Sequence, residues 1–251
     1  FSGGFYGDRY RTINVNRMKY LLFLLCFTAL GQADFEKNLQ KRLILAEDGS
    51  TIEIEAGRFQ LTKSLSLEGK KNITLRGKGI DQTILSFKGQ TQGAEGIKVS
   101  NCENIVIENM TTEDSKGDLI KTMNVKGITF RKIKAAWTGK PKATNGSYAL
   151  YPVLCEHVLI DSCIAIGASD AGIYVGQSKH IIVRNSEAYQ NVAGIEIENS
   201  LYADVYNNKA IGNTGGILVF DLPDLVQKKG GHVRVHHNLV KENNLANFAP
   251  K

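Results

Sequence analysis

The sequence has few of the residues that mark linker-rich, disulfide-rich or nucleic-acid-binding proteins. Its 251 residues include only 4 Pro, 4 Cys and 1 Trp. So little proline, beside 25 Gly, excludes long Pro-rich linkers and leaves many turns. Aromatic residues make up only 8%, which does not suggest a platform for stacking nucleic-acid bases. With 42% hydrophobic and 22% charged residues, the chain is neither a disordered protein nor a membrane bundle.

The cysteines do not have the pattern of a disulfide framework or of a zinc site. Three of them, Cys102, Cys155 and Cys163, follow the N-terminal region at irregular spacings, and an odd number cannot all pair. Cys102 and Cys155 share a column of the repeat described below, but two coils, ~10 Å, separate them, which is beyond disulfide reach. No CxxC or His/Cys spacing typical of zinc is present.

An apolar run near the N-terminus has the pattern of a secretory signal peptide. A Met-Lys pair at 18–19 precedes the run YLLFLLCFTAL, and Gly-Gln-Ala follows it. Because the run is shorter than the ~20 residues of a membrane span, we expect cleavage after Ala33 and a secreted or periplasmic protein. A buried helix is the alternative, and Cys26 lacks the small residue that usually precedes a lipoprotein cysteine. Residues 1–17 would then be an upstream segment, and 18–33 the signal peptide.

The positive net charge of the chain comes partly from this predicted leader, and without the leader it is small. The whole chain carries +6, from 31 Lys and Arg against 25 Asp and Glu. Residues 1–33 hold four of the basic residues and one acid, which leaves 27 against 24, or +3. So small a surplus gives no electrostatic footprint for nucleic acid, and no partner of that kind is expected.

One short pattern recurs six times and determines the fold class. The segments are GIKV (96–99), LIKT (119–122), ALYP (149–152), GIYV (172–175), GIEI (194–197) and GILV (216–219). They are spaced by 23, 30, 23, 22 and 22 residues, and each is followed by a second short alternating strand. Asn191 and Asn213 repeat at the same 22-residue spacing, where Asn tolerates a left-handed bend and can form a ladder.

Such short strands cannot fold alone, but stacked coils bury a continuous apolar cylinder with strands paired ~4.8 Å above and below. The pattern therefore predicts an all-β fold, a parallel β-helix of ~22-residue coils over 34–251. A β-sandwich is less favoured, because hairpins would not keep one period. A leucine-rich repeat is excluded, because its Leu-rich consensus is missing.

The sequence predicts a short helix that caps the N-terminal end of this cylinder. Residues 34–43 (DFEKNLQKRL) place apolar side chains four apart on one helical face, with Asp34 as a suitable N-cap. A short helix here would cover strand edges that otherwise invite aggregation. The other end, at Lys251, shows no such device, and there we expect a truncated sequence or a frayed last coil.

Three sequence segments of the repeat resemble those of a known family. GASDAGIYVGQS (167–178), GIEIENS (194–200) and GGILVFDLPDL (215–225) are similar to a bacterial family of parallel β-helix repeat proteins, over roughly residues 44–250. The resemblance implies the pectate-lyase-like superfamily and a right-handed coil. That superfamily includes polysaccharide lyases, glycoside hydrolases, uronan epimerases and a maturation factor of a periplasmic copper enzyme.

The outward residues of the repeated segments form two columns, because alternate residues of a strand face opposite sides. The first column reads Lys98, Lys121, Tyr151, Tyr174, Glu196 and Leu218, and the second reads Ser100, Met123, Val153, Gly176, Glu198 and Phe220. Members of a column lie ~5 Å apart, so the first column forms a stripe. Tyrosine faces suit stacking on sugar rings and lysines suit uronate carboxylates. Alternatively, the ladder only stabilises stacking.

The residues of the stripe suit lyase or epimerase chemistry on a uronate. Lys121 or Tyr174 would remove the C5 proton, and Lys98 would hold the carboxylate. Glu196 or Asp170 would orient a hydroxyl or Ca²⁺, and Tyr151 would bind the sugar.

Further carboxylates lie beside the stripe. Glu196 and Glu198, ~7 Å apart at their Cα atoms, form a candidate calcium or acid–base pair. Asp118 and Asp170 precede their outward strands, and one extra residue in the turn before Asp170 could direct its side chain to the stripe. Turn capping is the alternative for Asp170. No cofactor is certain, and Ca²⁺ is the candidate.

Two insertions are expected to flank the stripe along the coil axis. They are the loop 136–145, which begins near Trp137, and the loop 221–231. Loops added to a solenoid often wall its binding cleft, so Trp137 is a candidate substrate-binding residue. Ordinary surface loops are the alternative. His157 and His180 share another column, which is more typical of a surface ladder than of a metal site.

These features predict a monomeric, secreted or periplasmic protein that binds or modifies an acidic polysaccharide or oligosaccharide. The motifs typical of polygalacturonases, mannuronan epimerases and pectate lyases are absent, and a fold alone does not give an activity. A non-catalytic scaffold, or a maturation factor for a metalloenzyme, is therefore the alternative.

Overall fold

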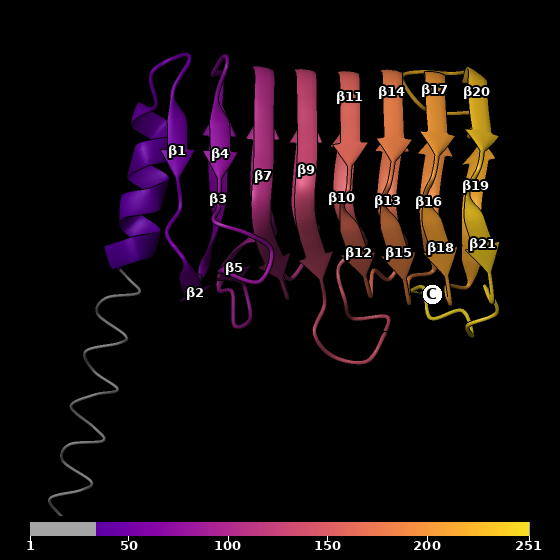
Figure 1. Ribbon diagram of the computed structural model, residues 1–251, viewed down its shortest axis with the longest axis horizontal. Coiled ribbons are helices and arrows are strands. Elements are labelled where there is room, and N and C mark those ends of the chain that lie inside the picture. The colour runs from indigo at the N-terminus through magenta and orange to yellow at the C-terminus, as the bar shows by residue number, and fades with distance from the viewer. Residues whose placement is uncertain (1–33, 251) are drawn as a thin grey trace, which may run out of the picture.

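The strands of successive coils stack in parallel, one directly above the next, as the repeat predicts (Figure 1). A computed structural model describes residues 34–250; the predicted signal peptide and the segment before it lie outside these residues. One sheet, sheet B, contains β3 (Lys63–Glu68), β6 (Gln92–Ser100), β8 (Ile120–Met123), β10 (Tyr148–Val153), β13 (Ala171–Gly176), β16 (Ala193–Glu198) and β19 (Gly215–Phe220).

The second sheet, sheet A, bends around the other two sides of the cylinder. In the first coils it contains β1 (Thr51–Glu53), β2 (Gly57–Gln60), β4 (Thr74–Arg76), β5 (Thr83–Ser86), β7 (Glu103–Glu113) and β9 (Lys126–Ala136). It continues through β11 (Glu156–Asp161), β12 (Ile164–Ile166), β14 (Lys179–Arg184), β15 (Glu187–Tyr189), β17 (Leu201–Tyr206), β18 (Lys209–Ile211), β20 (Gly231–His236) and β21 (Leu239–Lys241). The long strand β9 pairs with β11 in its first half and with β12 in its second.

The inward residues of the repeat form the core. Ile173 pairs in register with Ile195, and Val175 with Ile197, and all four side chains are buried. Burial of each such side chain contributes about 1.5–3 kcal/mol. Each coil thus adds the same apolar layer, which confirms the predicted parallel β-helix.

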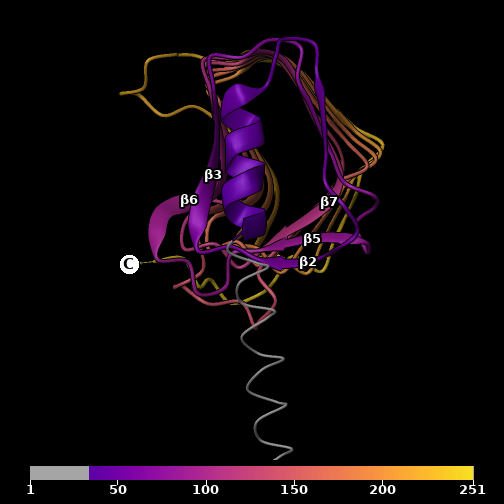
Figure 2. The ribbon, with the colours of Figure 1, turned by 90° about the vertical axis from the view of Figure 1, so that its left-hand side faces the viewer.

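A helix over residues 34–45 covers the first coil, as predicted, and Figure 2 shows it lying across the open end of the cylinder. Leu39 and Leu43 are each 1% exposed. The Gln40 amide pairs with the free edge of β3: its Nε2 donates to Ser66 O (3.0 Å), and its Oε1 accepts from Ser66 N (2.8 Å). A side chain therefore takes the place of the missing neighbouring strand. No helix within residues 34–250 combines the length and apolarity needed to cross a membrane.

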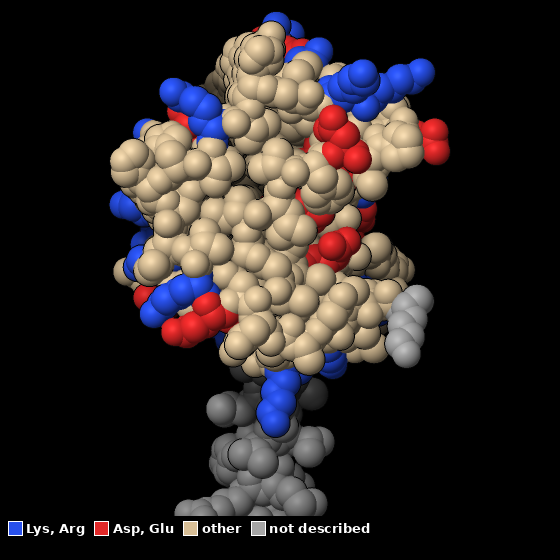
Figure 3. All heavy atoms as spheres, turned by 90° about the vertical axis from the view of Figure 1, so that its right-hand side faces the viewer, with Lys and Arg blue, Asp and Glu red and all other residues tan. Residues whose placement is uncertain are grey.

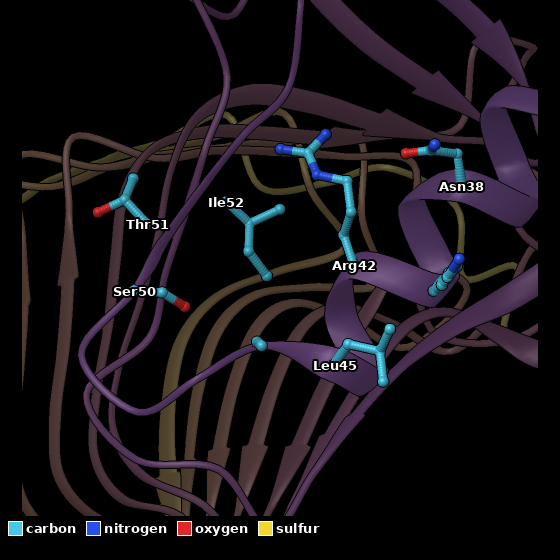
Figure 4. A pocket seen from close by; sticks show the side chains of 8 residues that line it. Asn38, Arg42, Leu45, Ser50, Thr51 and Ile52 are labelled. Atoms are coloured by element: carbon cyan, nitrogen blue, oxygen red, sulfur yellow. The ribbon is translucent and has the colours of Figure 1, made fainter.

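A gap of about 460 Å³ remains between this helix and the first coil (Figure 4). Arg42 extends from the helix towards the segment that carries Thr51 and Ile52, and its Nη2 donates to Glu53 O (2.6 Å). Since the guanidinium already ties the helix to β1, we assign this gap to the packing of the cap.

A column of alternating charge runs over the outer face of sheet A. Strand register places Glu53 beside Arg76, Arg76 beside Glu108, and Glu108 beside Arg131. The corresponding N···O distances are 3.2, 2.6 and 3.2 Å. The Glu53–Arg76 pair is exposed on both sides and contributes at most about 1 kcal/mol. Glu108 is 7% exposed and lies between two arginines, and together the pairs favour one register.

Asparagine ladders hold the bends from inside the cylinder. Asn213 Oδ1 accepts from the backbone N and the Nδ2 of Asn191, both at 3.0 Å. Asn213 Nδ2 donates to Ala188 O and to Asn243 Oδ1, also at 3.0 Å. The predicted Asn191–Asn213 ladder is confirmed, and it continues to Asn243.

Replacing Asn213 by Ala should lower the free energy of unfolding by about 2–4 kcal/mol, because buried backbone groups lose their partners. Urea unfolding followed by circular dichroism measures this. Asn244→Ala, at an exposed position of the last coil, is the matched control and should change stability by less than about 0.5 kcal/mol. Equal stabilities of the two variants would contradict the role of the ladder.

Candidate functional site

The two predicted columns lie on the outer face of sheet B in the predicted order. Lys98 pairs in register with Lys121, and Lys121 with Tyr151. Further along, Tyr174 pairs with Glu196, and Gly176 with Glu198. The repeat therefore brings lysines, tyrosines and carboxylates together on consecutive coils.

Three tyrosines at the centre of this face contact one another. The ring centroids of Tyr148 and Tyr151 lie 4.4 Å apart, those of Tyr148 and Tyr174 4.6 Å, and those of Tyr151 and Tyr174 4.9 Å. Tyr148 was not expected here. It precedes the repeated segment, and its contacts with Tyr151, Tyr174 and Ala171 place it on this face. The three rings form one aromatic surface.

A lysine lies beside the tyrosines. Lys121 Nζ is 4.7 Å from the centroid of Tyr151 and 3.8 Å from Asp118 Oδ2. This arrangement of carboxylate and ring favours an ammonium cation. Lys121 is therefore placed to hold an anionic group of a ligand.

Two nearly buried glutamates occupy the next coil. Glu196 is 7% exposed and Glu198 6%, although both belong to outward columns. Glu196 Oε2 is buried without a hydrogen-bond partner among the described residues. Burial, reinforced by the charges of Asp170 and Glu198, raises the pKa of Glu196 to about 7. Glu196 therefore changes its protonation state near neutral pH, which suits a general acid or base.

The two aspartates are perturbed in the same direction. Burial raises the pKa of Asp118 to about 6, although Lys121 and the backbone N–H of Tyr148 favour its ionised form. Burial also raises the pKa of Asp170, and a hydrogen bond from Tyr148 opposes the rise. The charge of Asp170 opposes the ionisation of both Asp118 and Glu196.

The tyrosines are held in their neutral form. Burial is the main cause of the raised pKa of Tyr174, followed by the charge of Glu198. Burial, with the charge of Asp118 next, raises the pKa of Tyr151 to about 12. A phenol in this environment is a hydrogen-bond donor at neutral pH. The expected role of Tyr174 as the base that removes a proton is therefore opposed by its surroundings.

The two inserted loops are joined to opposite ends of the strands of sheet B: one precedes its strand and the other follows its strand. Residues 137–147 lead into β10, whereas residues 221–230 follow β19. They lie at opposite ends of the strands, and they are also separated along the coil axis, because β13 and β16 stand between β10 and β19. Figure 2 shows the second loop extending beside the upper end of sheet B, and in Figure 3 acidic side chains gather on the same side of the molecule.

Trp137 does not belong to this surface. Its side chain is 4% exposed and packs in the core, and its Nε1 donates to Ser115 O (3.0 Å). Because the indole is enclosed, it offers no face to a sugar. The expectation that Trp137 binds substrate is therefore corrected: it anchors the first loop.

The expected calcium pair does not fit this geometry. Within residues 34–250, no group of three or more His, Cys, Asp or Glu side chains is arranged to hold a metal ion. We therefore derive no step through a metal.

The chain matches the family of the right-handed β-helix region, over residues 43–221 and again over 141–249, and it belongs to that family. No curated protein matches the chain. Among solved structures, ORF18 of Geobacillus virus E2 is 11% identical over 72% of this chain, with a TM-score of 0.53. This chain spans only 43% of that viral protein.

Two enzyme structures show a weaker likeness. The A-module of the mannuronan C-5 epimerase AlgE6 of Azotobacter vinelandii is 12% identical, over 82% of this chain and 81% of its own, with a TM-score of 0.39. The catalytic domain of a GH87 alpha-1,3-glucanase is 14% identical, over 68% and 34%, with a TM-score of 0.42. Likeness at these identities is one of fold alone.

The raised pKa of Glu196 predicts a loss of stability as the pH rises. The folded state binds this proton more tightly than the unfolded state, whose carboxyl titrates near 4.5. Folded stability is therefore lost between about pH 4.5 and 7, by roughly 2–3 kcal/mol from this group. Glu196→Gln should remove most of that dependence, measured by urea unfolding at several pH values. The exposed Glu156→Gln is the control, and unchanged pH dependence in Glu196→Gln would refute the assignment.

Proposed function

We propose that the protein binds a polysaccharide on the outer face of sheet B and cleaves it there by acid–base chemistry. The observation that supports this most is the nearly buried Glu196 carboxyl, with one oxygen unpartnered, beside a surface of three tyrosines. Cleavage of a glycosidic bond requires a proton donor and a second, ionised carboxylate, and an aromatic surface beside them can bind the sugar.

The distribution of charge along the stripe suggests how a chain would lie. Lys98 and Lys121 occupy one end of the stripe, the tyrosines the middle, and Glu196 the other end. Lys98 forms no ion pair within the described residues. A polysaccharide lying along the coil axis would place an acidic sugar over the lysines and stack its next ring on Tyr151, which is half-buried, whereas Tyr174 is only 4% exposed and supports the Tyr151 ring.

The carboxylates favour hydrolysis over elimination. Asp170, Glu196 and Glu198 make the reacting end acidic, and a uronate carboxylate placed there would be repelled. In hydrolysis one carboxyl with a raised pKa donates a proton to the leaving oxygen, while a second, ionised carboxylate takes a proton from the water molecule that attacks the sugar carbon. We assign these roles to Glu196 and Asp170. The acidic sugar then lies at the lysine end, away from the cleaved bond.

Location and partners follow from the same proposal. A polysaccharide substrate agrees with the predicted signal peptide at 18–33 and with a secreted or periplasmic protein. We infer a monomer, because one chain provides all the residues of the site.

The catalytic prediction concerns Glu196. The protein should release reducing ends from a uronate-containing polysaccharide, and Glu196→Gln should lower kcat by about 10²–10⁴ because the proton donor is lost. Reducing-sugar assays on a panel of polysaccharides measure this, with Glu156→Gln as the control. Unsaturated products would indicate elimination instead. Binding without turnover on every polymer would indicate a non-catalytic scaffold.

The binding prediction concerns Tyr151, which is less buried than Tyr174. Tyr151→Ala should weaken binding of oligosaccharides by about 5- to 100-fold, since a stacking surface is removed. Calorimetric titration measures the change. Tyr206→Ala, on an outward position of sheet A, is the matched control. Equal affinities of Tyr151→Ala and the wild type would place the binding surface elsewhere.

A further inference from the structure

A second column of side chains, on sheet A, forms a ladder of rings. His157, His180, Tyr202 and His232 follow one another on consecutive coils. Their centroids are 5.0, 5.3 and 5.0 Å apart, and neighbouring planes are within 13° of parallel. The sequence indicated only the first two members. The ladder lies on β11, β14, β17 and β20, which stand side by side in Figure 1.

The four ring residues have a backbone conformation that bulky side chains seldom adopt. Every member has a positive φ, between 53° and 57°. The equivalent positions of three earlier coils carry Asn72, Asn104 and Gly127, the residue types that adopt this conformation most readily. Tyr202 in particular is a bulky residue in the left-handed region. The same conformation occurs at other bends, for example at Leu154 and Gln177, so this column is distinguished by its rings and not by its backbone.

A groove of about 720 Å³ runs along the ladder. Its other wall is the next outward column of sheet A, formed by Leu159, Ile182, Asp204 and Arg234. The rings are accessible from this groove: Tyr202 is 51% exposed, and the three histidines are also exposed. Ile182, which is 38% exposed, adds an aliphatic surface.

The fixed charges around the groove largely compensate one another. Asp204 pairs with Arg234, and its Oδ1 also contacts His236 Nε2 at 2.8 Å. At the near edge Glu156 lies in register with Lys179. In the column beyond, Asp161 pairs with Arg184 at 2.8 Å. The histidines therefore decide the charge of the groove, and imidazole is the side chain that changes charge between about pH 5 and 8.

We propose that this groove binds an extended acidic polysaccharide, and that binding strengthens as the histidines gain protons. Protonated imidazoles on neighbouring coils repel one another, and an anionic chain along the ladder relieves this repulsion. The regular rise of the coils matches a polymer with regularly repeated carboxylates. Leu159 and Ile182 can contact the apolar faces of sugar rings.

A shared transition-metal ion does not explain the ladder. Adjacent rings are stacked almost parallel with their centroids 5.0 Å apart, so their nitrogens do not converge on one point. This site is separate from the face of sheet B, and its occupation does not depend on the hydrolysis proposed there.

Calorimetric titration of the protein with oligogalacturonate at about pH 5.5 and about pH 7.5 tests the proposal. Each proton taken up with the ligand strengthens binding by up to tenfold per pH unit, so affinity should rise at least about tenfold at the lower pH. His180→Gln, and independently His157→Gln, should remove most of this rise. His237→Gln, outside the lining of the groove, should keep it. Circular dichroism verifies that each variant is folded.

Three outcomes would overturn the proposal. They are an affinity that does not change with pH, full retention of the pH dependence in both histidine variants, and equally tight binding of polyglutamate, which would indicate a general polyanion surface. Glu196→Gln should leave this binding intact. Loss of turnover in that variant with retained pH-dependent binding would separate the two sites.

Discussion

The structure depends on one constraint: nearly every strand finds its hydrogen-bond partners in the coils above and below. The pitch is therefore fixed by strand pairing at about 4.8 Å, and each position of a coil meets the same position of its neighbours. Apolar residues that repeat at the inward positions make a continuous core, and Asn residues that repeat at the bends make ladders such as Asn191–Asn213–Asn243. The first coil has no strand before it, and there the Gln40 amide takes over the pairing.

The same constraint creates both candidate sites. A column of outward residues is a row of side chains about 5 Å apart on a rigid backbone, and its chemistry depends on which residues occupy it. On sheet B the row changes from lysine to tyrosine to glutamate, so one face offers a cation, an aromatic surface and a proton donor in order. On sheet A the row is a set of rings whose charge depends on pH. Neither site needs a deep pocket, which suits a ligand that is itself a long chain.

The sequence allowed the fold and the stripe to be predicted wherever the period held. Four residues could be placed because each occupies the third position of one repeated four-residue segment: Lys121, Tyr151, Tyr174 and Glu196. Asn243 was missed because the insertion at 221–230 lengthens its coil to 30 residues after Asn213. Trp137 was misplaced because a loop has no register, so nothing local shows whether its side chain turns inward. The protonation of Glu196 depends on burial by residues from several coils, which no single segment reveals.

The alternating charges on sheet A have a consequence for how such a protein can change its length. From Glu53 to Arg184 the sign reverses at every coil, through Arg76, Glu108, Arg131 and Asp161. Duplicating or deleting one coil within this region would set two like charges against each other, whereas a change by two coils would preserve the alternation. In this part of the molecule, growth or shortening by pairs of coils should therefore be tolerated better than by single ones.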